Sequence, residues 1–165
     1  MKRFLAYLLI IVLGIAVGFL LRGWVVGVTC VLGQSMNDTL VNGDYALVTR
    51  CGNAPQRGDI VQLELPERGG AYIKRVIGLP GDTVEIIGGN VHINGSALYE
   101  NYATLSDDDY YIELGDDEYF VLGDNRPVSY DSREEDFGVV SASCFRGRVR
   151  AILWPVSRID FSLER

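Results

Sequence analysis

A lysine in an apolar setting and a serine upstream of it most restrict the chemistry of this chain. Lys74 stands among Ile73, Val76 and other apolar residues, in a segment with the pattern of a half-buried strand. Lysine usually stays at the surface, because an isolated buried charge is energetically expensive. Ser35 lies 39 positions earlier in a short turn-like segment, and its hydroxyl is a poor nucleophile until a neighbouring base takes its proton. Because the sequence offers a single histidine, His92, we interpret Ser35 and Lys74 as a nucleophile–base pair.

A lysine acts as a base near neutral pH only if its pKa lies far below the ordinary value of about 10.4. Lowering that pKa by three units disfavours the charged form by roughly 4 kcal/mol, which burial among apolar groups can supply. Ile73, Val76 and Ile77 are the candidate walls, and Arg75 is expected on the opposite face of the strand. Taken singly, the serine and the lysine also fit ordinary roles, as a solvated turn serine and a surface strand lysine.

A polar loop after a short apolar strand supplies the third group of candidates. Residues 119–133 read YFVLGDNRPVSYDSR. Ser129 is suited to hydrogen-bond the lysine amine and fix its direction, the orienting role that a nucleophile–base pair needs. Asp131 and Arg133 are expected to pair and brace the loop, while residues 124–126 form further turn contacts. By itself, this segment is equally typical of an ordinary polar loop.

The N-terminal segment is the first of the elements that must position these residues. Residues 4–21 contain no charged side chain. As a helix they span roughly 27 Å, close to the ~30 Å hydrocarbon core of a bilayer, and residues 23–28 are apolar enough to extend the span. A cleaved secretory signal is the alternative, but its apolar region normally runs about 7–15 residues before a small-x-small site. Here residues 27–30 offer only a poor lipoprotein-type site.

The charges around this segment predict its orientation. Lys2 and Arg3 precede it, so the positive-inside rule predicts a single-pass protein of the cell membrane with a cytoplasmic N-terminus. Arg22 and Trp24 are expected at the lipid interface. We expect residues 1–28 to form the cytoplasmic N-terminus and transmembrane anchor, and residues 29–165 to form an extracytoplasmic β-rich catalytic domain.

Beyond the anchor the chain has the pattern of short strands separated by turn signals such as Asn-Gly, Gly-Gly and Pro-Gly. A hairpin is expected around residues 88–90, with a second turn at Asn94-Gly95, and a short helix around residues 133–136 is possible. Many short strands favour a mainly β fold of antiparallel sheets, folded over or closed into a partial barrel. The expected strands are Tyr45–Thr49, Asp59–Leu63, Ala71–Ile77, Thr83–Ile87, Val91–Ile93, Tyr119–Leu122 and Arg146–Leu153.

Composition argues against two classes of partner. The formal net charge is −7, whereas nucleic-acid binding rests on phosphate neutralisation by Lys and Arg, so we expect no nucleic-acid partner. Cys30, Cys51 and Cys144 lack metal-site spacing and no histidine cluster accompanies them, so we expect no metal. The sequence leaves their disulfide state open.

The ordered set of these segments resembles bacterial type I signal peptidases over most of the chain. Each segment by itself is weak evidence, whereas the set in this order behind an apolar N-terminal segment is very specific. The matching motifs are GQSMNDTL at 33–40 with NGD at 42–44, RGDIV at 57–61, YIKRVIGLPGD at 72–82, NG at 94–95, GDNRPVSYDSR at 123–133, and WP at 154–155.

The resemblance implies a membrane-anchored serine endopeptidase that removes N-terminal signal peptides from exported preproteins, with no metal or organic cofactor. By position, Ser35 is then the nucleophile and Lys74 the general base, with Ser129, Asp131 and Arg133 in supporting roles. The family prefers small residues at the first and third positions before the cut. Our candidates for the walls of those shallow pockets are Met36, Tyr72 and Ile73. The short stretch between the lysine and the final motif suggests the compact form common in Gram-positive bacteria.

Two positions depart from the usual family pattern. Asp38 replaces a proline, which restores a backbone N–H and frees φ, and its carboxylate is expected to raise the proton affinity of the lysine if it lies close by. Gly33 stands where some members carry a hydroxyl that helps to hold the oxyanion. With glycine there, stabilisation of the oxyanion rests mainly on backbone N–H groups, including that of Ser35. Neither position carries a reacting group, so we expect activity.

Three rival interpretations remain. Self-cleaving Ser/Lys repressors use a related fold, but they carry a DNA-binding N-terminal domain where this chain has an apolar segment. A catalytically silent, membrane-anchored β module that serves as an assembly chaperone or adaptor would tolerate loss of Ser35 or Lys74. A Ser–His–Asp hydrolase would use His92, which lies in a segment typical of a hairpin strand.

Overall fold

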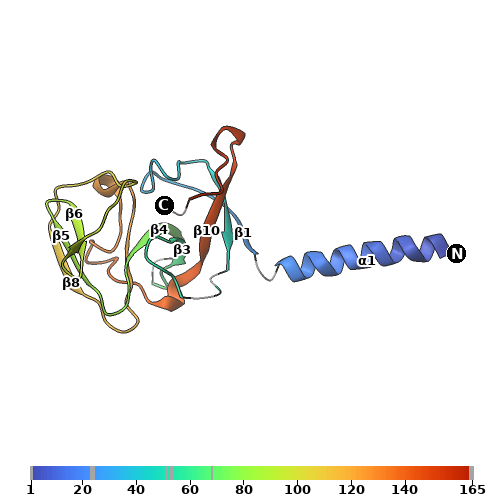
Figure 1. Cartoon of the computed structure of the whole chain (residues 1–165), viewed down its shortest axis with the longest axis horizontal. Coiled ribbons are helices and arrows are strands. Elements are labelled where there is room, and N and C mark those ends of the chain that lie inside the picture. Colours follow the sequence, from blue (N-terminus) through green and yellow to red (C-terminus); the bar gives the residue numbers. More distant parts are fainter. Residues whose placement is uncertain (1, 23–24, 51, 53, 68, 164–165) are drawn as a thin grey trace.

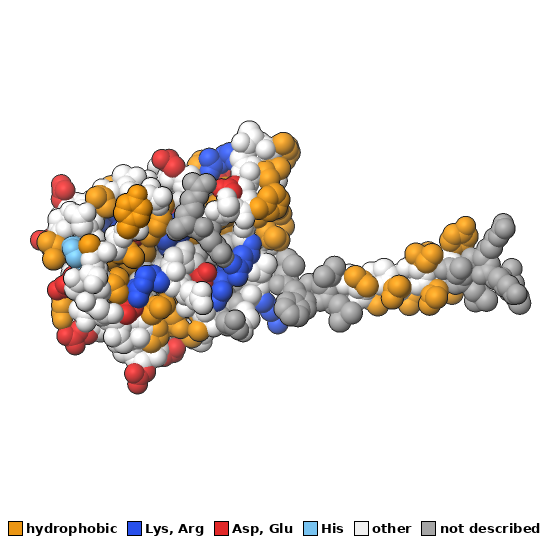
Figure 2. All heavy atoms as spheres, viewed as in Figure 1, with side chains coloured by type: hydrophobic (Ala, Val, Ile, Leu, Met, Phe, Trp, Pro, Cys, Tyr) orange, Lys and Arg blue, Asp and Glu red, His pale blue; other side chains and the backbone are white. Residues whose placement is uncertain are grey.

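The structure is a computed structural model that describes residues 2–22, 25–50, 52, 54–67 and 69–163. Lys2–Arg22 form one helix, α1, which extends away from the β-rich part of the molecule (Figure 1). The segment contains no proline and is rich in leucine, which favours a helix. Hydrophobic side chains are exposed along its described part (Figure 2).

Within the residues that the structure describes, no helix combines the length and apolar character required to cross a membrane. We expected Arg22 and Trp24 at a lipid interface. The side chain of Arg22 and the whole of Trp24 lie outside the part of the chain that the structure describes.

Six antiparallel strands form the larger sheet, in the order β1-β2-β10-β3-β4-β9. The strands are β1 Val25–Cys30, β2 Tyr45–Thr49, β3 Ile60–Glu64, β4 Ala71–Gly78, β9 Phe120–Leu122 and β10 Phe145–Trp154. Although β1 is an edge strand and β4 lies near the other edge, residues of both line one cavity. The sheet therefore curves enough for β1 and β4 to face one cavity.

A smaller antiparallel sheet has the order β7-β6-β5-β8 and lies at the end of the β-rich part farthest from α1 (Figure 1). Its strands are β5 Thr83–Ile87, β6 Asn90–Ile93, β7 Ser96–Ala97 and β8 Tyr110–Glu113. The β5–β6 turn uses Gly88 and Gly89 at positive φ, where glycine carries no steric cost. The 3₁₀ turns are η1 Arg126–Val128, η2 Ala142–Cys144 and η3 Val156–Arg158.

Strand β4 holds the molecule together because its side chains reach all three hydrophobic clusters. Ile73 packs against the cluster that contains Met36. Val76 belongs to the cluster beside β9 and β10, and Ile77 to the cluster under the smaller sheet. This strand also carries Lys74, so the lysine is held by a strand that packs against all three clusters.

The seven expected strands correspond to seven strands of the structure, with ends shifted by two residues at most. Three strands were missed: β1, β7 and β8. We interpreted residues 23–28 as a continuation of the membrane segment, but Val25–Cys30 pair with β2. A short apolar run is compatible with either assignment, and only the partner strand distinguishes them. The prediction of a short helix around residues 133–136 was wrong, because this segment forms successive hydrogen-bonded turns.

Candidate active site

Lys74 is buried, with 3% of its surface exposed, and lies opposite Val61 across the β3–β4 ladder. Its Nζ donates a hydrogen bond to Ser129 Oγ at 3.0 Å. Burial lowers the pKa of Lys74 to about 8, although the negative charge of Asp131 opposes the shift. The Arg133 guanidinium lowers this pKa further, and Asp124 raises it. The amine therefore has the electrostatic setting that a lysine base requires.

Ser35 lies in the compact turn that follows β1. The Asn37 N–H donates to the Gln34 carbonyl at 3.1 Å, and the Leu40 N–H donates to the Met36 carbonyl at 2.8 Å. The buried side chain of Met36 fixes the turn to the core. Sequence spacing indicates a turn here, but only the folded chain shows what holds it.

Ser35 and Lys74 line one cavity of about 280 Å³ between β1 and β4. Met36, Tyr72 and Ile73, the expected walls of the substrate pockets, line it too. The lysine amine donates a hydrogen bond to Ser129, and Ser35 lines the same cavity.

The turn that carries Ser35 and the side chain of Ser129, which accepts from Lys74, meet at the backbone of Gly123. A Cβ added to this glycine would lie 2.2 Å from Ser129 Oγ and 2.4 Å from the Ser35 carbonyl oxygen. Both groups therefore pack directly on the Gly123 backbone. Only a residue without a side chain allows this approach.

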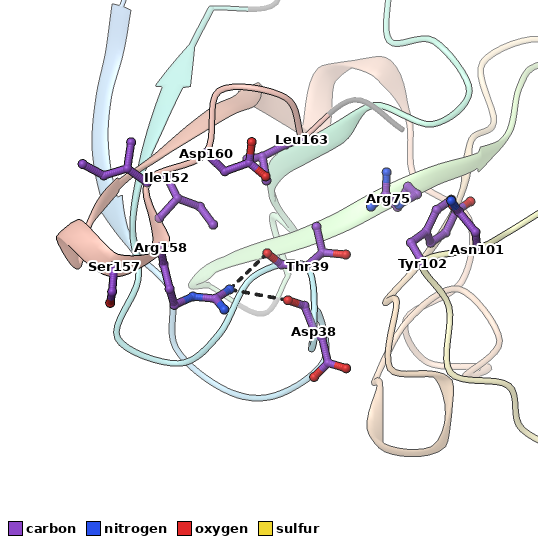
Figure 3. A pocket seen from close by; sticks show the side chains of 11 residues that line it. Asp38, Thr39, Arg75, Asn101, Tyr102, Ile152, Ser157, Arg158, Asp160 and Leu163 are labelled. Carbon is purple, nitrogen blue, oxygen red and sulfur yellow. Dashed lines mark hydrogen bonds between the residues drawn. The ribbon is translucent and has the colours of Figure 1, made fainter.

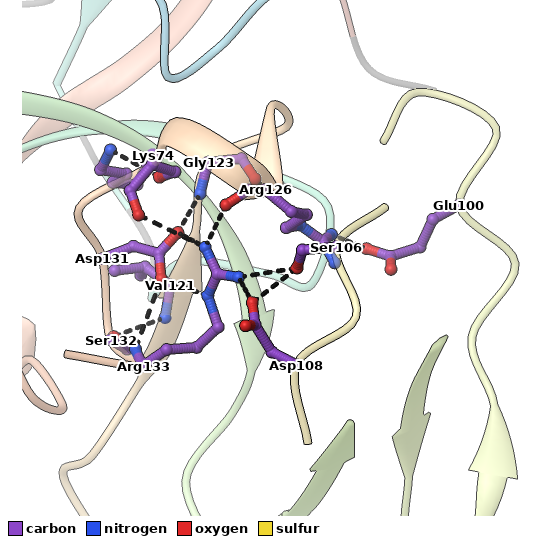
Figure 4. A network of polar contacts seen from close by, with 11 residues as sticks. Lys74, Glu100, Ser106, Asp108, Val121, Gly123, Arg126, Asp131, Ser132 and Arg133 are labelled. Atoms are coloured by element: carbon purple, nitrogen blue, oxygen red, sulfur yellow. Dashed lines mark hydrogen bonds and ion pairs between the residues drawn. The ribbon is translucent and has the colours of Figure 1, made fainter. Parts of the chain in front are cut away.

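Asp131 and Arg133 form the brace expected of them (Figure 4). Asp131 is fully buried; its Oδ1 accepts from Arg133 Nε at 2.9 Å and its Oδ2 accepts from the Gly123 N–H at 3.0 Å. Arg133 also donates to the Ser129 carbonyl at 3.3 Å and pairs with Asp108. The loop after β9 is thus tied both to the residue that contacts the lysine and to the acidic segment before β8.

A buried ion pair behind the site is a feature that the sequence does not indicate. Arg75 points to the face opposite Lys74, as alternation predicts, and donates to both carboxylate oxygens of Asp124, at 2.9 and 2.7 Å. Its guanidinium also lies 3.8 Å from the centre of the Tyr102 ring. Thr39 donates to the same carboxylate, which joins the serine turn to this pair. The partners are 49 residues apart in sequence, and no local pattern links them.

Asp38 lies in a different cavity, of about 580 Å³, next to Arg158 (Figure 3). Arg158 donates to the Asp38 carbonyl oxygen at 3.4 Å, while the Asp38 side chain is exposed. The carboxylates that raise the pKa of Lys74 are those of Asp131 and Asp124. The condition under which Asp38 would act on the lysine is therefore not met, because its exposed carboxylate is not among the charges that shift the Lys74 pKa.

The remaining candidates occupy ordinary positions. His92 lies in β6, where its Nδ1 contacts the Asn90 carbonyl at 3.2 Å, as expected for a hairpin strand. Cys30 and Cys144 are free thiols, and Cys51 lies outside the described residues.

Comparison with known proteins assigns this arrangement to a class. The family model described as "Signal peptidase, peptidase S26" matches residues 3–154. A signal peptidase I of Leptolyngbya laminosa is 38% identical over 84% of this chain and 74% of its own length. Signal peptidase I P of Bacillus subtilis subsp. natto is 34% identical over 90% of this chain and 88% of its own. The crystal structure of a signal peptidase I from Enterococcus faecalis aligns with a TM-score of 0.52 and 36% identity, over 58% of this chain and 97% of that one.

These matches, with the antiparallel sheets of the fold, define a hydrolase of the serine endopeptidase class. The chain belongs to the signal peptidase family, peptidase S26. The activity that membership supports is removal of signal peptides from exported preproteins by a serine protease.

Proposed function

We propose that Ser35 is the nucleophile and Lys74 the general base of this endopeptidase. The observation that carries the proposal is the buried amine of Lys74, whose pKa is lowered to about 8, in the cavity that Ser35 also lines. With that pKa roughly one amine in ten is neutral at pH 7, against about one in three thousand at the ordinary value. Burial thus raises the population of the active base by more than two orders of magnitude.

The catalytic cycle begins when neutral Lys74 accepts the Ser35 hydroxyl proton as Oγ attacks the scissile carbonyl carbon. The oxyanion is held by backbone N–H groups, and one such donor is commonly worth about 10²–10³ in rate. The lysinium then protonates the leaving amine, which frees the mature protein and leaves an acyl-enzyme at Ser35. A water that gives its proton to Lys74 attacks the acyl carbon, releases the signal peptide as a carboxylate and restores the serine.

Three residues support this pair. Ser129 holds the amine at 3.0 Å and directs it. Asp131 favours the lysinium that forms during attack, while Arg133 limits how far it does so, because their charges act on the Lys74 pKa in opposite directions. Their mutual ion pair keeps this balance fixed in space.

Substrate binding is proposed to use the edge of β1 and the cavity beside it. An extended signal peptide adds a strand to an exposed sheet edge through main-chain hydrogen bonds, which tolerate varied sequences. Met36, Tyr72 and Ile73 line the cavity and are the proposed walls for the small side chains before the cut.

The test of the proposal is incubation of the purified chain with a preprotein that carries a signal peptide, with the cut located by mass spectrometry. We expect one cut after a small residue with the native chain and none with Ser35→Ala, since the variant lacks the attacking oxygen. Circular dichroism establishes that both proteins are folded. Equal cleavage by the two would rule out Ser35 as nucleophile, and no cleavage by either would favour the silent adaptor.

We also propose that the N-terminal segment anchors the chain in the cell membrane with its N-terminus in the cytoplasm and the catalytic domain outside. Lys2 and Arg3 before the apolar residues 4–21 support this orientation. Signal peptides enter the bilayer, so a tether raises the effective concentration of enzyme against them.

Deletion of residues 1–21 is expected to lower the rate on membrane-borne preproteins by at least about tenfold while leaving cleavage of short soluble peptides nearly unchanged. The two rates are compared with preprotein in lipid vesicles and with a peptide in detergent-free buffer. Equal losses on both substrates would contradict a tethering role.

A further inference from the structure

Asn125 makes two hydrogen bonds to the turn that carries Ser35. Its backbone N–H donates to the Ser35 carbonyl at 3.0 Å, and its side-chain Nδ2 donates to the Gln34 carbonyl at 3.1 Å. A carbonyl oxygen only accepts hydrogen bonds, so the NH₂ end of the amide must face Gln34. A carboxylate of the same shape cannot replace it. Asn125 therefore grips two successive peptide groups, one on each side of the Ser35 α-carbon.

The Gln34 carbonyl matters because it shares a peptide group with the Ser35 N–H. That peptide is trans and planar, so its C=O and N–H point in opposite directions. The Asn37 N–H and the Asn125 amide both donate to this carbonyl, each at 3.1 Å, and together they fix the direction of the Ser35 N–H. Among the described residues the Ser35 N–H has no hydrogen-bond acceptor, and Ser35 lines the cavity. This N–H is therefore a donor without a partner among the described residues.

Asn125 is itself rigidly held. The neighbouring Asp124 is buried and bound by Arg75 through two hydrogen bonds. On both sides of Asn125 the backbone pairs with Thr104, whose N–H donates to the Asp124 carbonyl at 2.9 Å and whose carbonyl accepts from the Arg126 N–H at 3.1 Å. The side-chain amide thus starts from a fixed backbone, as a residue that orients another must.

We propose that Asn125 is a positioning residue for the oxyanion site: its amide aims the Ser35 N–H at the oxygen that becomes negative during attack. The inference rests on the proposed role of Ser35 as nucleophile. Hydrogen bonding to the Gln34 carbonyl also polarises that peptide group, which strengthens its N–H as a donor. The site depends on the Ser35 N–H all the more because Gly33 has no hydroxyl that could donate a second hydrogen bond to the oxyanion.

The experiment compares the native chain with Asn125→Ala and Asn125→Asp. Both variants lose the amide donor, and the aspartate also repels the Gln34 carbonyl. We expect kcat to fall about tenfold in the first and further in the second, with KM within about twofold, because the interaction matters only once the oxyanion forms. The loss is smaller than that from deleting an oxyanion donor outright, about 10²–10³, because the N–H stays but is less well aimed.

A pair of inhibitors separates positioning from a merely structural role. A peptide boronic acid, which forms a tetrahedral adduct with serine, should lose affinity in proportion to kcat. A peptide of the same sequence with a non-cleavable reduced amide should keep its affinity. The pH midpoint of kcat/KM should not move, because the structure shows no contact between Asn125 and Lys74 among the described residues. Asn90→Ala is the matched control: its amide likewise donates to backbone carbonyls, of Ile87 and Gly88, but in the β5–β6 turn.

Unchanged kcat in both Asn125 variants would overturn the inference, as would a rise in KM with kcat retained or an equal loss of affinity for the two inhibitors. Ser35→Ala, assayed beside them, distinguishes the two levels of failure. If it is inactive while the Asn125 variants keep full kcat, only the positioning role fails. If it retains activity, the proposed nucleophile fails first.

Discussion

Lys74→Met is expected to reduce cleavage of a preprotein by at least about 10⁴-fold, since removing one member of a nucleophile–base pair commonly costs that much or more. Methionine has a similar length and no charge, so it suits a position that is 3% exposed. Lys74→Arg should be equally inactive, because a guanidinium stays protonated and cannot accept the serine proton. The measurement is initial rate by gel or mass spectrometry, with the melting temperature of each variant recorded. A purified, folded Lys74→Met that still cleaves would remove lysine as the base.

The pH dependence of the native chain is a second measure of the same base. The Lys74 pKa is lowered to about 8, and the neutral form is the active one. The value of kcat/KM should therefore fall about tenfold per pH unit below about pH 8 and level off above it. An amine in water would instead give a rise that continues towards pH 10. A profile that is flat between pH 6 and pH 9 would contradict the assignment.

Gly123→Ala is expected to lower kcat by about 10²-fold or more, although alanine adds only a methyl group. The added carbon would lie 2.2 Å from Ser129 Oγ and 2.4 Å from the Ser35 carbonyl oxygen, which real atoms do not allow. Ser129 is buried, and the Ser35 atom in question is a backbone oxygen. Neither atom can move aside as the end of a long flexible side chain would. The turn that carries Ser35 and the side chain of Ser129 must therefore move apart. Misplacement of reacting groups by about 1 Å can lower the catalytic rate about 10²-fold.

The matched control for this substitution is Gly52→Ala. An added Cβ at Gly52 meets no atom within 4 Å, and the residue is exposed. We expect this variant to retain the native rate and melting temperature. Gly123→Ala should lose rate by a larger factor than any loss of stability explains, as judged by circular dichroism at the assay temperature. Native activity in Gly123→Ala would mean that the serine turn and Ser129 need not pack on this backbone.

Local pattern was sufficient for most of the fold. Runs of three to eight residues indicated seven strands, and glycine-containing turns separated several of them. These signals are carried by neighbouring residues, so they survive without knowledge of the partner strand. The same logic failed for Val25–Cys30, where an apolar run suits either a membrane helix or a strand and only its pairing with β2 decides. The two-residue strand β7 carries too few residues to form a pattern.

The sequence by itself indicated the family and the proposed reacting groups, because a serine, an apolar-flanked lysine and a polar loop occur in order within recognisable motifs. Their family is confirmed by comparison. Only the tertiary structure decided what surrounds them: that the Asp38 carbonyl oxygen accepts a hydrogen bond from Arg158, and that Arg75 forms an ion pair with Asp124. Hydrogen bonds and charge interactions depend on distance in space, and chain segments 50 to 90 residues apart meet only after the sheets have formed.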